Sequence, residues 1–478
     1  MVLLNFAQIR NNLENKNCKE GIKIVFYHQG KNENEIVVQK QNNKQYLNDA
    51  KAKGFAGEFF IADDVIFFSL GKIEECNSVN AAWQVQKQMG SLYTLLKNRF
   101  NSHKIEFDQH EHLKHCYYGF ILASYDYNFL KKDPKIVSFN LIVKKEFKEI
   151  VEVAHFQNIA RFLGDTPANL MTPTLFVEYA TDLMKGNSNV EMKVLEEEEC
   201  KKLGMNLFLS VGTGSVEKSK LLTLKFFNGN SDRHQLAMVG KGVCFDSGGT
   251  SLKPSLNMHK MKMDMMGAAT IFCAFSTAVK LNLKINLTCT IPLVENMPGS
   301  RATKPGDVFV GMAGKSVEIG NTDAEGRLIL GDALSYAQKM YGKLPENVID
   351  AATLTGAMRV SLGNVYGGYF SNSDSLSKKI NQATTESAEK LWRLPLSKHY
   401  QETLTSNVAD FNNIGARGRG GSITAAEFLH HFIDENVNWA HFDIAGLMDE
   451  AVLKEIYGAE ATGRPLPAFV ELIKKLID

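Results

Sequence analysis

The sequence predicts an α/β protein with a smaller N-terminal α/β domain and a larger C-terminal domain. Three observations support this. A chain of 478 residues exceeds the size of one typical domain. Strand-like and helix-like segments alternate, a pattern typical of a mainly parallel sheet covered by helices. A segment rich in proline follows a helical pattern near residue 163 and indicates a boundary.

The N-terminal domain is predicted to span residues 1–150. Runs of β-branched and aromatic residues are typical of strands, whereas apolar residues at helical spacing indicate helices. We expect strands over 21–30, 65–71 and 135–143 and helices over 77–100 and 112–130. Residues 151–172 are predicted to form a connecting helix and linker, because a helical pattern reaches GDTPANLMTPTLF there and stops.

Residues 173–478 are predicted to form the larger domain, with a mainly parallel central sheet. Its expected strands are 189–195, 221–229, 234–240, 285–294, 347–354 and 439–446, with two short strands in 306–321 and helices over 177–186, 195–204, 261–281 and 327–341. Ligands of such sheets gather at the carboxyl ends of the strands. Lys241, Asp246, Thr353 and Ala445 all lie at or just after such ends.

Composition and charge narrow the class of protein. Hydrophobic content of 44% and charged content of 22% are those of a soluble globular protein. A net charge of +1 predicts no binding to nucleic acid or to an anionic membrane. The seven cysteines are scattered without a CxxC pair, and no signal peptide or membrane span is evident, so we expect free thiols and a cytoplasmic location.

A histidine-rich segment precedes the helix predicted from residue 112. His103, His110, His112, His115 and Cys116 form a cluster that could suggest zinc, but the spacing HxHxxHC matches neither a structural zinc site nor HExxH. Because the surrounding residues are polar, we interpret the segment as a solvated loop and helix start.

Two glycine-bearing segments, 238–264 and 321–328, hold the residues that predict chemistry. Among their residues are four carboxylates and three cations that could form one site, namely Asp246, Asp264, Asp323, Glu325, Lys241, Lys253 and Arg327. Two divalent metals about 3.5–4 Å apart need several carboxylates to offset a charge of +4. In an extended segment the third and fifth residues of NTDAEGRL point to the same side. A dinuclear hydrolase site and a Mg-dependent phosphoryl-transfer site both remain open on these residues.

The two lysines are assigned different states. Lys241 ends a buried strand, where burial and a nearby dication both favour the neutral amine that a metal ligand must be. Lys253 lies in the glycine-rich turn and can stay charged to face a developing oxyanion.

Several motifs resemble the leucyl aminopeptidase (cytosol aminopeptidase) family. These are VGKGVCFDSGG, MDMMGAAT, AATLTGAM, WAHFDIAG and, most specifically, NTDAEGRLIL. The similarity extends over about 155–478, whereas residues 1–150 match only in length and α/β character. It implies a catalytic metallopeptidase domain over 173–478 that removes N-terminal residues, Leu, Met and other apolar ones preferred, from peptides with a free N-terminus, in peptide catabolism.

The resemblance also implies the roles of the site residues. The tighter metal site would use Lys241, Asp246, Asp264 and Glu325, and the more exchangeable one Asp246, Asp323 and Glu325. Zn is expected, with Mn or Mg able to replace it at the exchangeable site. Lys253 would polarise the scissile carbonyl, and Arg327 would hold a bicarbonate as general base. The substrate's side-chain pocket would be lined by Met261, Thr353, Gly356, Ala445 and Met448.

The family further implies a homohexamer. Departures from its common pattern, at His259, Lys260 and Met266, fall on no ligand position and concern the rim and shape of the pocket. The alternative is a non-catalytic or DNA-binding relative with the same fold. The near-neutral N-terminal region and the complete set of ligands and catalytic cations argue against it.

Overall fold

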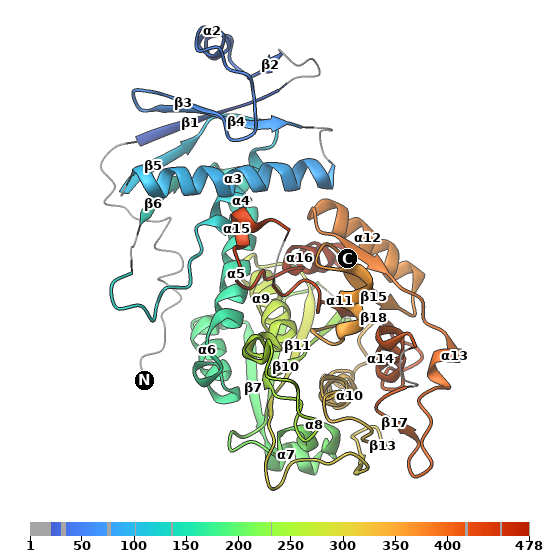
Figure 1. The fold of residues 1–478 in the computed structure, drawn as a ribbon. Coiled ribbons are helices and arrows are strands. Elements are labelled where there is room, and N and C mark those ends of the chain that lie inside the picture. The colour runs from blue at the N-terminus through green and yellow to red at the C-terminus, as the bar shows by residue number, and fades with distance from the viewer. Residues whose placement is uncertain are drawn as a thin grey trace. The chain divides into compact units, whose positions relative to one another are not determined.

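A computed structural model describes residues 21–29, 35–73, 78–100, 102–134, 137–230, 232–415, 419–449 and 452–477. The segment in which no signal peptide was recognised, 1–20, lies outside these ranges. The chain forms two compact units (Figure 1). The first comprises 1–159 with 452–459, and the second comprises 160–451 with 460–478.

The first unit is built on a six-stranded sheet in the order β3-β4-β1-β5-β6, with β2 paired to β1. Its strands are β1 (Gly21–Gln29), β2 (Ile36–Val37), β3 (Phe59–Ala62), β4 (Val65–Lys72), β5 (Ser102–Phe107) and β6 (Ser138–Ile142). The pairs β1–β4, β1–β5 and β5–β6 are parallel. The short strand β2 pairs antiparallel with β1, and β3 pairs antiparallel with β4. The predicted small α/β arrangement is therefore present.

Helices cover this sheet because their apolar residues meet those of alternate strand positions. The helices are α2 (Gln41–Asp49), α3 (Val79–Arg99), α4 (Leu113–Ala123) and the short α15 (Lys454–Tyr457). Val25 and Tyr27 of β1 pack with Leu47 of α2, whereas α3 and α4 pack against each other. Helix α4 is shorter than predicted: it ends at Ala123, because the following SYDYN run favours turns.

The histidine-rich segment differs from the prediction in its environment. It does include a helix start, since His112 is the N-cap residue of α4. It is not solvated, however: His110 is 3% exposed, His112 is 4% exposed and Cys116 is fully buried. The polar neighbours in the sequence did not reveal that this loop folds back against the sheet, where the rings of His110 and Phe26 form a T-shaped pair.

The chain passes from the first unit to the second through helix α5 (Lys148–Asp165), which follows a single 3-10 turn, η1 (Lys145–Phe147). Arg161 of α5 is fully buried and its Nε donates to the carbonyl of Ala461, 2.8 Å away. Pro167 and Pro173 end the helical pattern, and α6 starts at the second of them with Thr172 as its cap.

The second unit contains a nine-stranded sheet in the order β16-β15-β18-β14-β9-β11-β8-β7, with β10 paired to β11. Its strands are β7 (Val190–Glu196), β8 (Lys220–Phe227), β9 (Leu236–Gly240), β10 (Gly242–Asp246), β11 (Asn286–Asn296), β14 (Asn347–Ala352), β15 (Gly367–Ser371), β16 (Leu391–Arg393) and β18 (Asn438–Asp443). The central strands β18, β14, β9 and β11 are parallel, and antiparallel pairs lie towards both edges. The predicted α/β class with a mainly parallel central sheet is confirmed.

Helices cover both faces of this sheet (Figure 1). They are α6 (Pro173–Met184), α7 (Glu197–Lys202), α8 (Asn206–Gly212), α9 (Met266–Lys280), α10 (Gly326–Ala337), α11 (Gly356–Leu362), α12 (Asp374–Glu386), α13 (Lys398–Gln401), α14 (Gly421–His430) and α16 (Leu466–Lys475), with 3-10 turns η2 (Ala168–Leu170) and η3 (Met258–Met263). Helices α8 and α10 share a core with Ala237 and Val239 of β9. Helix α9, packed with α16, covers the opposite face.

Two further features bear on the predictions. The helix predicted over 261–281 is divided, since η3 ends at Met263 and α9 begins at Met266, which leaves Asp264 between them. A small sheet of β12 (Val308–Val310), β13 (Ser316–Glu318) and β17 (Phe411–Asn412) lies apart from the main one. Among the described helices, none is both long and apolar enough to cross a membrane.

Candidate active site

Lys241 is the single residue between β9, which ends at Gly240, and β10, which begins at Gly242. Its side chain is 3% exposed, and its ammonium lies 2.8 Å from a carboxylate oxygen of Asp264 and 2.8 Å from one of Glu325. It also donates to the carbonyl of Thr353, 3.0 Å away. Strands β9 and β14 are parallel neighbours, so their carboxyl ends bring Lys241 and Thr353 together.

The glycine-rich turn after β10 brings Asp246 and Lys253 to the same place. Gly248 and Gly249 have φ of +88° and +65°, a region that favours glycine. A Cβ at Gly249 would also lie only 2.7 Å from an oxygen of Asn296. The turn returns the Lys253 ammonium to within 2.8 Å of Asp246, and the same ammonium makes a very short contact with Asp323.

Asp264 occupies the break between η3 and α9 and is 6% exposed. The hydroxyl of Thr353 donates to its Oδ1 over 2.6 Å. Its Oδ2 lies 2.8 Å from the Lys241 ammonium but accepts no well-directed hydrogen bond from any described residue. This buried carboxylate thus keeps an acceptor oxygen available for a cation.

Asp323 and Glu325 reach the site from a turn, not from an extended segment. The amide of Asp323 donates to the Asn321 side chain, 2.9 Å away, and the Glu325 backbone is already helical at the start of α10. The predicted extended geometry is therefore wrong. The two carboxylates converge nonetheless, because the turn places Asp323 beside Lys253 while Glu325, at the N-cap position of α10, faces Lys241.

Three of these carboxylates are close enough to share a metal. One oxygen from each of Asp246, Asp323 and Glu325 lies within 4.8 Å of the other two. Burial, together with the charge of Glu325, raises the pKa of Asp246 to about 6. Burial likewise raises the pKa values of Asp264 and Asp323 above their ordinary range. Carboxylates crowded and buried in this way need cations beside them to stay ionised.

The two lysines supply that positive charge. Burial lowers the pKa of Lys241, but the charges of Asp264 and Glu325 outweigh it and hold this pKa above its ordinary value. The same balance, with Asp246 as the main partner, holds the pKa of Lys253 above its ordinary value. Burial also raises the pKa of Glu325, but Lys241 and Lys253 outweigh it and leave this pKa below its ordinary value. Burial therefore acts on Lys241 in the expected direction, and the neutral amine that was expected for a metal ligand stays a prediction that depends on a nearby dication.

Arg327 is the second residue of α10. It is 7% exposed and does not line the pocket. One terminal nitrogen donates to the carbonyl of Asn413 over 2.7 Å, whereas its Nε is buried with no hydrogen-bond partner among the described residues. Burial lowers the pKa of Arg327 to about 10, so the side chain remains a cation. An unpaired buried N–H of this kind suits an anionic partner.

An open pocket joins the site to the surface. It is lined by Lys241, Asp246, Lys253, Asp264, Asp323 and Glu325, together with all five residues expected to line a substrate pocket, namely Met261, Thr353, Gly356, Ala445 and Met448. Of the twelve predicted site residues, only Arg327 is outside this lining. Leu354, Leu256 and Met258 add apolar surface to it.

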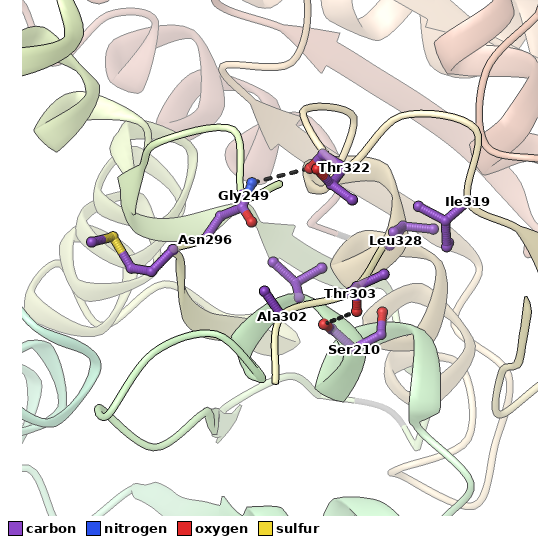
Figure 2. A pocket seen from close by; sticks show the side chains of 10 residues that line it. Ser210, Gly249, Asn296, Ala302, Thr303, Ile319, Thr322 and Leu328 are labelled. Atoms are coloured by element: carbon purple, nitrogen blue, oxygen red, sulfur yellow. Dashed lines mark hydrogen bonds between the residues drawn. The ribbon is translucent and has the colours of Figure 1, made fainter. Parts of the chain in front are cut away.

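Two residues that position the site, Asn296 and Thr322, were not among those predicted from the sequence. Asn296, at the end of β11, donates from Nδ2 to Asp246 over 2.8 Å and to the carbonyl of Thr322 over 3.0 Å. Figure 2 shows Asn296 joined to Thr322 beside a small cavity, with a second link from Thr303 to Ser210. The Thr322 hydroxyl donates to the carbonyl of Gly248 over 2.7 Å. The strand-end rule that singled out Lys241 could have found Asn296 as well.

Asn413 also fixes the loop that carries Thr322 and Asp323, through Gly320 and Asn321. Its side-chain oxygen accepts from the amide of Gly320 over 2.8 Å, and its Nδ2 donates to the carbonyl of Asn321 over 2.8 Å. Nothing in its local sequence indicates this role, because the contact joins segments 92 residues apart.

A sheet whose carboxyl edge gathers four carboxylates and two lysines in one pocket has the construction of a metal-dependent hydrolase. Comparison with known families makes the class specific. The catalytic-domain profile of the cytosol aminopeptidase family matches residues 158–470. The chain belongs to this family, and it is a peptidase.

Individual relatives agree with this assignment. The cytosol aminopeptidase of Encephalitozoon cuniculi is 43% identical over 468 residues, which are 96% of this chain and 93% of that protein. The cytosol aminopeptidase of Dictyostelium discoideum is 46% identical over 334 residues, 69% of this chain and 64% of that protein.

Solved structures share the fold along nearly the whole chain. The bottromycin maturation enzyme BotP in complex with Mn has a TM-score of 0.83 and 27% identity, and the match covers 96% of this chain and 100% of that one. A mutant tomato leucine aminopeptidase has a TM-score of 0.82 and 26% identity, with 96% and 94% covered. Both the family and the fold therefore point to aminopeptidase activity.

Proposed function

We propose that this aminopeptidase removes Leu, Met and other apolar residues from the N-terminus of peptides with the help of two divalent metal ions. The observation that carries the proposal is the meeting of Asp246, Asp323 and Glu325, with ligand oxygens within 4.8 Å of one another, in a pocket that also holds Lys241 and Asp264.

The donors in the pocket fit two metals. We assign Lys241, Asp246, Asp264 and Glu325 to the tighter site, and Asp246, Asp323 and Glu325 to the more exchangeable one. Support comes from the lysine ammoniums, which lie among the carboxylates where positive charge is needed, and from the unsatisfied Oδ2 of Asp264. Zn is the expected ion, with Mn or Mg at the exchangeable site, and such ions supply an activated water at neutral pH.

Lys253 and Arg327 are proposed as the catalytic cations. Lys253 is one-fifth exposed at the pocket, so its ammonium can turn from Asp246 and Asp323 towards a substrate carbonyl and stabilise the charge that develops on its oxygen. Arg327 is proposed to hold a bicarbonate ion as general base. Its buried, unpaired Nε supports an anion there, while the contact with Asn413 fixes the guanidinium.

The apolar part of the pocket is proposed to select the substrate's first side chain. Met261, Gly356, Ala445 and Met448 line it with little polar surface, and Thr353 directs its hydroxyl at Asp264 instead of into the opening. A free α-amine on the substrate would bind at the metal cluster and Asp264. Since each methylene in such a pocket changes specificity by only about 1–3 kcal/mol, we expect broad tolerance of apolar residues.

The test is hydrolysis of Leu-p-nitroanilide by the full chain, with added Zn or Mn and after chelation. Activity should require metal and return when metal is restored. The matched control is N-acetyl-Leu-p-nitroanilide, which presents the same side chain without a free amine and should not be cleaved. Absence of activity with every metal tried would remove the proposal, and equal cleavage of both substrates would remove the part concerning the free N-terminus.

We also propose a homohexamer in the cytoplasm. The support is the family membership and the names of the relatives. Light scattering on the purified full chain measures the mass directly, and a monomer at micromolar concentration would contradict the assembly while leaving the assignment of activity intact.

A further inference from the structure

A second group of metal-type ligands lies in the first unit, far in sequence from the candidate active site. His28 comes from the end of β1, and His110 and Glu111 come from the segment after β5. One ligand atom of each lies within 4.8 Å of the others. His112 is adjacent, with Nε2 3.7 Å from the Glu111 carboxylate.

The topology of the sheet explains why these residues meet. Strands β1 and β5 are parallel neighbours, with Ile24 opposite Phe107, so the segments that follow them leave the same edge. After β1 the chain forms β2, which pairs antiparallel with the end of β1, and then reaches β3 and β4 on one side of β1, whereas after β5 it goes on to β6 on the other side. In open α/β sheets, ligands bind in the crevice outside two such strand ends, where the connections diverge.

The hydrogen bonding of the imidazoles is incomplete. Nδ1 of His28 and Nε2 of His112 are buried and have no hydrogen-bond partner among the described residues. His112 is only 4% exposed, so water does not readily serve its ring nitrogen. The nearest carboxylate, Glu111, lies 3.9 Å from His28 Nε2, beyond hydrogen-bond distance. Packing against aromatic rings accounts for the burial of these histidines but leaves their nitrogens unsatisfied.

A neutral imidazole carries one nitrogen lone pair, and that nitrogen is the atom that a metal binds. In His110 one such nitrogen, Nδ1, accepts a 3.2 Å hydrogen bond from the amide of His112, which a metal at that atom would displace.

We propose that His28, His110 and Glu111 bind one divalent transition-metal ion of the zinc class, with His112 or a water molecule completing the coordination. Nitrogen and carboxylate ligands suit Zn²⁺, whose tetrahedral ligand atoms lie roughly 3.3 Å apart at bond lengths of about 2.0–2.1 Å. The present spacing of up to 4.8 Å requires the group to close slightly, which the exposed Glu111 side chain can do by rotation. The N-terminus of α4 disfavours a cation nearby, and the Glu111 charge offsets this.

Such an ion would fasten the end of β1 to the segment that starts α4. It would stabilise the first unit in proportion to its occupancy, because it binds the folded chain and not the unfolded one. Nothing in the proposed peptidase mechanism depends on this ion.

The test counts metal ions on the full chain. Wild-type protein and variants are stripped with chelator, equilibrated with Zn²⁺ at a buffered free concentration, and analysed for metal per chain. Wild-type protein should hold one ion more than His28→Gln and one more than His110→Gln. The matched control, His103→Gln, changes a histidine in β5 outside the cluster and should hold as much as wild type. Leu-p-nitroanilide hydrolysis should be the same in all four proteins.

Substitutions of the buried histidines could lower metal content by disturbing the fold. Glu111→Gln is a second test without that drawback, because the Glu111 side chain is nearly half exposed. It should weaken binding of the additional ion by roughly tenfold to a hundredfold, as loss of a coordinating or orienting group commonly does. The Zn²⁺-dependent increase in the thermal midpoint should shrink in parallel. Equal metal content and an equal Zn²⁺-dependent shift in wild type, His28→Gln and Glu111→Gln would overturn the proposal.

Discussion

Gly326 is the first residue of α10, directly behind Lys241, and it offers a sharp test of how tightly the site is packed. A Cβ at this position would lie 2.6 Å from Lys241 Cε, 2.7 Å from Cδ and 2.8 Å from Nζ. Ordinary contact begins at 3.4 Å, so Gly326→Ala should displace the lysine side chain by about 0.8 Å (3.4 − 2.6). Contacts to Asp264 and Glu325, both 2.8 Å, oppose that movement.

The magnitude follows from two opposing effects. Alanine is better than glycine within a helix by about 1 kcal/mol, so Gly326→Ala would be neutral or stabilising if space allowed. Forcing an extra methyl into a packed interior costs about 1–3 kcal/mol. Because Lys241 is the proposed ligand that moves, we expect affinity for the tighter metal to fall at least about tenfold, or about 1.4 kcal/mol.

The assay is metal content at buffered free Zn²⁺, together with thermal unfolding of the metal-free protein. Gly356→Ala is the matched control for both measurements: Gly356 also begins a helix in the pocket wall, α11, and a Cβ there meets nothing within 4 Å. Metal affinity of Gly326→Ala within twofold of wild type would refute the view that the Lys241 side chain is held in one position as a ligand.

Three further outcomes are expected. Lys253→Ala and Arg327→Ala should both keep their metal, measured after dialysis. Turnover of Leu-p-nitroanilide should fall about 10²–10³-fold in Lys253→Ala, which loses an oxyanion donor, and about 10²–10⁴-fold in Arg327→Ala, which loses base catalysis. Loss of metal from either variant would mean that the roles are wrong. Asp323→Asn should lose the exchangeable ion first, leaving about one ion per chain on dialysis, and simultaneous loss of both would contradict the division into two sites. His110→Gln should reduce acid sensitivity: because burial lowers the folded-state pKa of His110 to about 3, the wild-type chain loses stability as pH falls below the unfolded value of about 6.5. The difference in urea unfolding between pH 8 and pH 5, with chelator present, should be smaller in His110→Gln by about 2 kcal/mol; no difference would show that the ring is already charged or exposed.

The central sheet could be predicted because its strands are buried on both faces and therefore read as continuous apolar runs. Once those runs were placed in a parallel sheet, their carboxyl ends had to share an edge, which brought Lys241 and Thr353 together. Here the ammonium and the Thr353 carbonyl are 3.0 Å apart although 112 residues separate them. The pocket lining followed from the same rule together with the family resemblance.

The loops could not be predicted at the same level. Residues 321–325 form a turn fastened by Asn413 from a distant segment, so the conformation depends on a contact that local sequence does not encode. The histidine group shows the same limit. His110 and His112 looked solvated because their neighbours in sequence are polar, and His28 entered no pattern until the pairing of β1 with β5 placed it beside them.

The states of the two lysines depend on charge as much as on burial. Four carboxylates with a formal charge of −4 surround two ammoniums. Burial lowers the pKa of Lys241, but the charges of Asp264 and Glu325 outweigh it and hold this pKa above its ordinary value. In the proposed metal-loaded site those same carboxylates would bind the ions, which would remove the reason for Lys241 to keep its proton and leave its lone pair for coordination. Loading the tighter site would then exchange a proton on Lys241 for a metal ion, with the carboxylates already gathered. Lys253, which faces Asp246 and the pocket opening, would keep its charge.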